Sequence, residues 1–300
     1  MKVKIPDELK ADVPQTRFGK LLTATPIVMT VIATMLAGLS SSEMTRAQYD
    51  RSLAAQQQSK AGDQWSFFQA KRLRGAMQRS TLDLLQATTE VHPLNVQAVF
   101  ASAGGELSPA VIAALEKSEL PSASPVPALD ADVKAALAAL ESLKPEPEIA
   151  ALLVPVKVQT LAESLRLATD AALALDAATK PVNQAIDQLE KSLGAKGDRN
   201  LSRDFAAARL RYTAQRYDTE ARLNQAVAYV YELQVRKSNV SAEHHHARSQ
   251  RFFYGMLAAQ MAVIIATFAI AARQRNLLWS IAAIAGLAAI ALAVYVYLFV

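Results

Sequence analysis

Three stretches of the chain contain no charged residue and are long enough to cross a lipid bilayer. They cover residues 21–39, 252–272 and 276–300. A helix rises about 1.5 Å per residue, so about 20 apolar residues cross the hydrocarbon layer. The pattern therefore predicts transmembrane helices over residues 21–40, 252–272 and 277–300. No segment alternates polar and apolar residues as a strand does, so we expect an all-α fold.

The first apolar stretch could instead belong to a cleaved signal peptide, because five basic residues precede it. The apolar part of a signal peptide usually spans about 7–15 residues, and this stretch is longer. We therefore interpret it as a retained membrane anchor that follows a short segment, residues 1–20.

Residues 41–251 read as one helical domain between the first and second spans. Ser41, Ser42 and Glu43 are typical of a helix start, and few helix breakers follow until His92. Within this helix, apolar and small residues recur at alternating four- and three-residue steps. They are Leu73, Met77, Ser80, Leu84, Ala87 and Val91. The spacing indicates a coiled-coil-like seam.

Residues 93–155 are rich in proline and alanine, and proline disrupts helix interiors. We expect short helices near residues 109–118 and 131–143, gathered at the end of the domain far from the membrane. The alternative is a disordered linker. A helix over residues 156–179 should stop before Pro181, resume after it and end near Gly194 and Gly197.

From residue 198 to residue 273 the chain contains no proline, which predicts one long helix that includes the second span. Its outer part carries four tyrosines: Tyr212, Tyr217, Tyr229 and Tyr231. They could form a binding strip. We favour packing against the helix over residues 43–90, with the hydroxyls reaching water or carboxylates.

The net charge of +5 does not indicate a nucleic-acid partner, because residues 41–251 are nearly balanced. The excess lies beside the spans, where basic residues in short loops stay cytoplasmic. Arg273 and Arg275 therefore place the loop over residues 273–276 in the cytoplasm. The N-terminus is then cytoplasmic too, and residues 41–251 are periplasmic in a bacterial inner membrane.

The sequence offers little catalytic chemistry. It contains no cysteine and four histidines, and it lacks the common phosphate-binding and metalloprotease motifs. His244, His245 and His246 form the one local cluster. Neighbouring residues on a helix point about 100° apart, so one chain cannot turn all three onto one ion. Several subunits could form a metal-binding ring, but we favour a polar collar. We expect no enzyme, no cofactor and no metal site.

The predicted spans contain no ionisable residue, which argues against a proton pathway. Small residues recur at every fourth position in both C-terminal spans: Ala258, Ala262 and Ala266, then Ala285, Ala289 and Ala293. This spacing permits close helix packing in lipid, although an alanine-rich composition alone would also produce it.

One segment supports a resemblance to a known family. Asp63-Gln64-Trp65-Ser66-Phe67-Phe68-Gln69-Ala70-Lys71-Arg72-Leu73-Arg74, together with the paired C-terminal spans, resembles a bacterial family of membrane proteins, domain of unknown function 4337. The resemblance covers about residues 17–90 and 198–300 and implies a fold outline without an activity. We expect Trp65, Phe68, Lys71 and Arg72 to serve packing or an interface.

The leading hypothesis is a non-enzymatic scaffold anchored in the lipid bilayer that forms homo-oligomers through its periplasmic domain. The alternative is an accessory or channel-like subunit of a larger envelope or transport complex.

Overall fold

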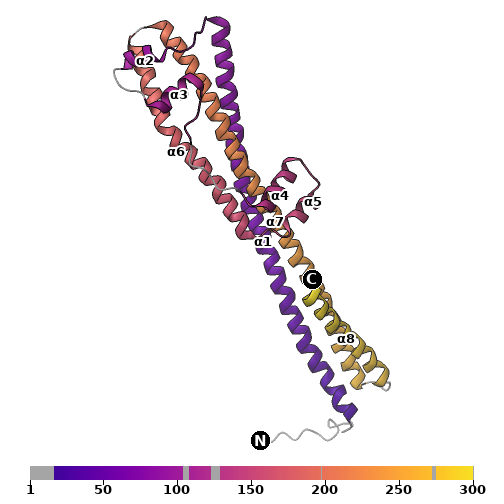
Figure 1. Cartoon of the computed structure of the whole chain (residues 1–300). Coiled ribbons are helices and arrows are strands. Elements are labelled where there is room, and N and C mark those ends of the chain that lie inside the picture. Colours follow the sequence, from indigo (N-terminus) through magenta and orange to yellow (C-terminus); the bar gives the residue numbers. More distant parts are fainter. Residues whose placement is uncertain (1–16, 104–107, 123–128, 197, 272–274, 300) are drawn as a thin grey trace, which may run out of the picture. The chain divides into compact units, whose positions relative to one another are not determined.

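The computed structural model describes residues 17–103, 108–122, 129–196, 198–271 and 275–299, and every regular element in these ranges is a helix. The all-α expectation is confirmed. The helices are α1 (Arg17–Thr88), α2 (Val96–Ala103), α3 (Pro109–Lys117), α4 (Ala131–Glu141), α5 (Glu146–Leu153), α6 (Val158–Lys196), α7 (Arg199–Ala271) and α8 (Arg275–Phe299) (Figure 1). They form two compact units: the membrane unit (Met1–Leu53 with Ser238–Val300) and the helical unit (Ala54–Lys237).

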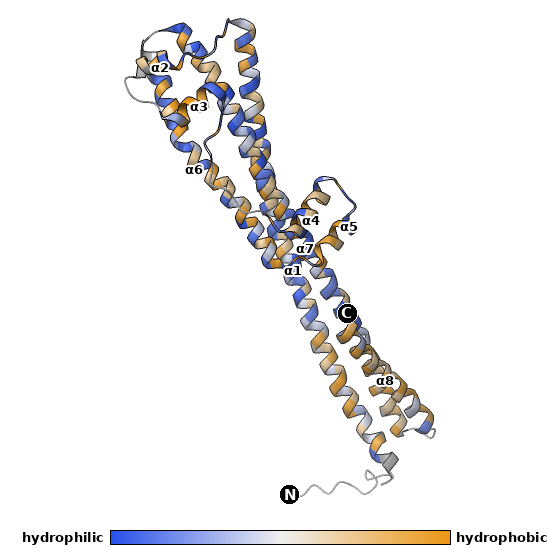
Figure 2. Cartoon of the chain, viewed as in Figure 1, coloured by the Kyte–Doolittle hydropathy of each residue, from blue (hydrophilic) through white to orange (hydrophobic). Residues whose placement is uncertain are grey.

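The membrane unit contains segments of α1 and α7 and the whole of α8, and each of these helices is long and apolar enough to cross a membrane. Figure 2 shows the dense hydrophobic colouring of α8 and of these segments. Large apolar side chains such as Ile27, Phe268 and Leu287 are exposed, while Ala262, Ala266 and Ala289 are buried. This distribution suits a bundle surrounded by lipid, where small residues allow helices to approach closely.

Helix α8 contacts both of the other helices in the membrane unit. The indole nitrogen of Trp279 donates a hydrogen bond to the Thr25 hydroxyl of α1, at 3.1 Å. A Cβ atom added to Gly286 would lie 2.7 Å from the Met29 sulfur, so glycine permits this approach. Of the predicted alanine rows, Ala262, Ala266 and Ala289 are fully buried. The remaining three, Ala258, Ala285 and Ala293, are partly buried.

Three threonines inside the spans bond to their own helices. The hydroxyls of Thr30, Thr34 and Thr267 donate to the carbonyls of Pro26, Thr30 and Val263, at 2.7, 2.9 and 2.8 Å. These local bonds satisfy groups that lipid cannot hydrogen-bond. The three threonines are therefore compatible with lipid-facing positions.

Two glycines of the membrane unit differ in their surroundings, and this predicts different effects of enlarging them. A Cβ at Gly255 would lie 3.3 Å from Leu36 and 3.4 Å from Leu292, whereas one at Gly38 would meet nothing within 4 Å. We expect Gly255→Leu to destabilise the unit by about 1–3 kcal/mol through overpacking. Gly38→Leu should leave stability unchanged or raised. Denaturant titration of both variants in detergent micelles checks this, and equal effects would contradict the packing.

The helical unit is built on residues 54–88 of α1, on α6 and on residues 199–237 of α7, with the short helices in two places (Figure 1). Helices α2 and α3 pack where α6 turns into α7, in a core that includes Val99, Leu115, Ile186 and Phe205. Helices α4 and α5 pack in a second core with Leu161 and Leu233. The expectation that residues 93–155 gather at one end is therefore wrong.

The α4–α5 pair is tied to α7 by polar contacts as well. The Lys237 ammonium donates to the Leu153 and Val154 carbonyls at the end of α5, at 3.0 and 3.1 Å. Burial lowers the pKa of this ammonium. Arg236 donates to Glu146 at 3.1 Å. Cationic groups are favourable beside carbonyls at a helix C-terminus, so these bonds fix α5 on α7.

Two predicted helix boundaries are wrong. Helix α1 continues through Ser41 and Ser42, where a helix start was expected, and α6 continues through Pro181. Pro181 removes one helical hydrogen bond, but Leu175, Thr179, Val182 and Ile186 are all buried on one face around it. Burial of that face outweighs the lost bond. The short helices near residues 109–118 and 131–143 are confirmed as α3 and α4.

Candidate self-association surface

The distinctive aromatic segment of α1 packs against α7 within the helical unit. The Trp65 indole donates to the Glu232 carboxylate at 2.7 Å. Its ring lies edge-on to Phe68 and Tyr229, with centroids 5.4 and 5.2 Å away. Arg72 remains on the surface with its guanidinium 5.7 Å from the Phe68 ring centroid. The segment therefore anchors one helix on the other.

Ion pairs and a close backbone approach continue this contact along α1. Lys71 pairs with Glu220, and Arg79 pairs with Asp218. Between them, a Cβ at Gly75 would lie 3.1 Å from the Asp218 carboxylate. The inner face of α1 thus follows Phe68, Lys71 and Gly75, so the predicted seam, which begins at Leu73, points elsewhere.

The seam residues form an exposed row on α1, called here the outer row: Leu73, Met77, Ser80, Leu84 and Ala87. Leu73, Met77 and Leu84 are 64%, 59% and 63% exposed. Their four- and three-residue spacing is that of helices that pair by side-chain interdigitation. The row therefore remains largely exposed within the described part of the chain.

Other large apolar side chains of the helical unit are also exposed, but they are scattered. Leu143 and Val154 lie between helices, Val158 and Leu173 lie at distant positions of α6, and Phe67 lies on α1 outside the spacing of the outer row. Single exposed apolar residues are normal in soluble domains, whereas a contiguous set at heptad spacing marks a contact surface. This distinction singles out the outer row.

Tyr212 lies in the core rather than on a surface strip. It is 1% exposed and packs with Ile186, Leu189 and Phe205. Its hydroxyl has no hydrogen-bond partner among the described residues, so the expectation that it reaches water or a carboxylate is wrong. Burial raises the pKa of this phenol. The hydroxyl therefore stays protonated at neutral pH.

The histidine cluster contacts the carboxylate of Glu43, a residue that the sequence predicts to lie at a helix start. Glu43 is 6% exposed, and its carboxylate lies 2.6 Å from the His245 Nδ1 atom. Arg46 and Arg248 each place a guanidinium nitrogen 3.6 Å from the same carboxylate. Next to this cluster, Ser40 and Ser249 exchange hydroxyl-to-carbonyl hydrogen bonds of 3.0 and 2.8 Å. The cluster joins α1 to α7 within the membrane unit.

The three histidines do not converge. The rings of His244 and His245 are 5.9 Å apart, and the His246 Nε2 atom lies 3.1 Å from the Gln250 amide nitrogen. Partial desolvation, aided by Arg248, lowers the pKa of His244. Among the described residues, no group of three His, Cys, Asp or Glu side chains is arranged to hold a metal ion. The sequence feature that could have located this cluster is an acid, Glu43, close to the first span and a run of histidines and arginines, residues 244–251, close to the second.

The structure describes only one of the two arginines on which the predicted membrane orientation depends. Arg273 lies outside the described residues, and Arg275 is the first residue of α8. The cytoplasmic placement of the loop stays a prediction.

Part of the chain matches a known family. Residues 22–107 match the DUF4337 family model, a domain of unknown function. The resemblance is thereby confirmed over that range, which contains both the aromatic segment and the outer row. Residues 198–300 lie outside the DUF4337 match. Searches of curated proteins and of solved structures found no match.

Proposed function

We propose that the protein is a non-enzymatic, membrane-anchored scaffold that forms homo-oligomers through the outer row of α1. The exposure of Leu73, Met77 and Leu84 at heptad spacing is the observation that carries the proposal. Burying apolar surface at such a row contributes roughly 25 cal/mol per Å². A second copy supplies an identical row.

The membrane anchors favour pairing between copies in one bilayer. Two copies inserted in the same membrane present α1 in the same direction, so each residue of the outer row meets its own counterpart. The row contains no charged residue, so this parallel pairing brings no like charges together. Restricting the copies to one membrane also raises their effective concentration, which strengthens a contact of modest area.

We further propose that residues 41–251 extend into the periplasm from a bacterial inner membrane. The basic residues at 273 and 275 support this orientation, because positive charges in a short loop remain cytoplasmic. The nearly balanced charge of the domain supports a protein partner and not a nucleic acid.

Site-specific cross-linking tests the pairing, and the absence of cysteine makes the chain suited to it. We expect Met77→Cys to form a disulfide-linked dimer on mild oxidation in membranes, because paired residues of the row bring their Cβ atoms within disulfide range. The readout is the dimer band on a non-reducing gel.

Gln86→Cys is the matched control, since Gln86 is exposed on the same helix but lies off the outer row. It should cross-link far less than Met77→Cys. Equal yields at the two positions would mean random collision and would contradict pairing through the row.

A further inference from the structure

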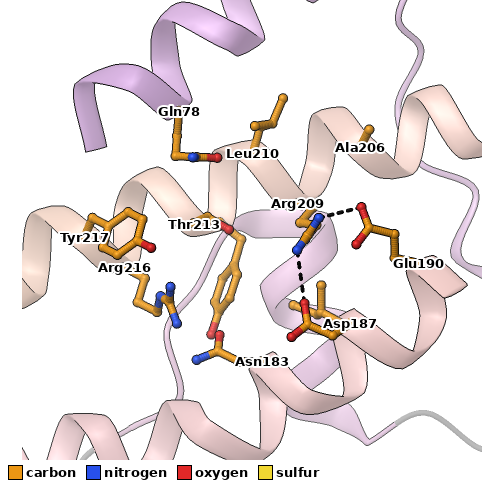
Figure 3. A pocket seen from close by; sticks show the side chains of 12 residues that line it. Gln78, Asn183, Asp187, Glu190, Ala206, Arg209, Leu210, Thr213, Arg216 and Tyr217 are labelled. Atoms are coloured by element: carbon orange, nitrogen blue, oxygen red, sulfur yellow. Dashed lines mark hydrogen bonds and ion pairs between the residues drawn. The ribbon is translucent and has the colours of Figure 1, made fainter. Parts of the chain in front are cut away.

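A cavity of about 490 Å³, partly open to the surface, lies in the helical unit and is lined by α1, α6 and α7. Its polar lining includes Gln78, Asn183, Arg209 and Arg216, and its apolar lining includes Ile186 and Leu210 (Figure 3). Small-molecule sites are typically about 300–1,000 Å³ and combine an apolar wall with a few placed polar groups. The size and lining both fit that class.

Two buried donors at this cavity lack acceptors. The Tyr212 hydroxyl and the Arg216 Nε atom are buried and have no hydrogen-bond partner among the described residues. Tyr212 also lines the cavity and is only 1% exposed. A buried polar group without a partner destabilises the fold, so such groups point to a missing ligand or solvent molecule.

Of the two arginines that line the cavity, Arg216 has the weaker contact with an acid. Arg209 is held by Asp187 at 3.1 Å and by Glu190 at 2.5 Å, and Figure 3 shows Arg216 apart from both acids. The Arg216 Nε atom lies 3.5 Å from Glu220, beyond a normal hydrogen bond, and Lys71 also pairs with that carboxylate. Arg216 therefore shares Glu220 with Lys71, and its Nε–H group forms no hydrogen bond with a described residue.

We propose that this cavity binds a small organic anion whose acidic group accepts hydrogen bonds from the Tyr212 hydroxyl and the Arg216 Nε–H. The remainder of the molecule would lie on Ile186 and Leu210. Both unpartnered groups are donors, so the ligand must present acceptors, and a carboxylate or phosphoryl group provides several. This site is independent of the outer row.

Titration of the full chain in mild detergent with benzoate, phenyl phosphate and neutral benzamide tests the proposal. At constant ionic strength, at least one of the two anions should bind saturably by calorimetry, and whichever binds identifies the acidic group. Benzamide has the shape of benzoate without its charge, so it should bind at least about tenfold more weakly than the anion.

Tyr212→Phe removes the hydroxyl and keeps the ring, and it should weaken anion binding by about tenfold or more. Arg216→Gln should do the same. Tyr231→Phe makes the same chemical change as Tyr212→Phe on the same helix, outside the cavity lining, and should leave binding unchanged. Far-UV circular dichroism establishes that each variant folds.

Three outcomes would overturn the proposal. The first is no saturable binding of either anion. The second is equal binding of benzamide, and the third is unchanged affinity in folded Tyr212→Phe protein.

Discussion

Replacing Glu43 with glutamine is expected to lower the unfolding free energy of the membrane unit by about 3 kcal/mol. The Glu43 carboxylate is buried and faces His245, Arg46 and Arg248. Removing its charge leaves the cationic groups close together without the anion that neutralises them. Removing one partner of a buried ion pair is strongly destabilising, because the remaining charge is then uncompensated. The side chains of His245 and Arg248 are 21% and 22% exposed and that of Arg46 is 60% exposed, so the value lies at the low end of the usual range.

The two tryptophans allow the unfolding free energy of the membrane unit to be measured separately from that of the helical unit. Trp279 lies in the membrane unit and Trp65 in the helical unit. In a Trp65→Phe background, the fluorescence of Trp279 reports on the membrane unit during denaturant titration in micelles.

Glu243→Gln is the control, because Glu243 is an exposed acid beside the same histidines. It should change stability by no more than about 0.5 kcal/mol, as for most surface substitutions. If Glu43→Gln were equally mild, the buried cluster would not hold α1 and α7 together.

The double substitution of Leu73→Lys with Met77→Lys is expected to abolish self-association while leaving each chain folded. Both side chains are more than half exposed within the chain, so lysine costs little there. In a parallel pair, each lysine would face its own copy across the interface, where like charges cost several kcal/mol. Association should weaken by at least about a hundredfold, measured by sedimentation in detergent.

Leu173→Lys provides the comparison, because Leu173 lies on α6 and is as exposed as the outer row, at 62%. It introduces a lysine at an exposed apolar site that the proposal does not use. Association should be retained in this variant. Loss in both variants would show that charge alone, and not the outer row, controls assembly.

The membrane spans could be predicted from sequence because a charge-free apolar run of 18 or more residues is rare outside transmembrane helices. Helix α3 begins at Pro109, and α4 follows Asp130, whose carboxylate accepts from the Asp132 and Val133 amides. These are local start signals that the sequence displays. Helix α5 carries Pro147 in its first turn, a position that proline fits, so the high proline content of residues 93–155 does not exclude a helix there.

The packed face of α1 could not be predicted in the same way. Counting apolar residues selects Leu73, Met77 and Leu84, but the contact with α7 uses Gly75 and the charged Lys71 and Arg79. A glycine that permits close helix approach does not appear in a pattern of apolar residues. Neither does a cation whose partner carboxylate lies on a distant segment. The same holds for Glu43, whose partner His245 is 202 residues away.

The mass of the wild-type particle in mild detergent tests the proposed self-association most directly. One chain has a mass of 32.4 kDa. After correction for bound detergent, we expect a protein mass of at least twice that value, with no second protein present. A mass of 32.4 kDa alone, at concentrations where the chain is folded, would contradict the scaffold function.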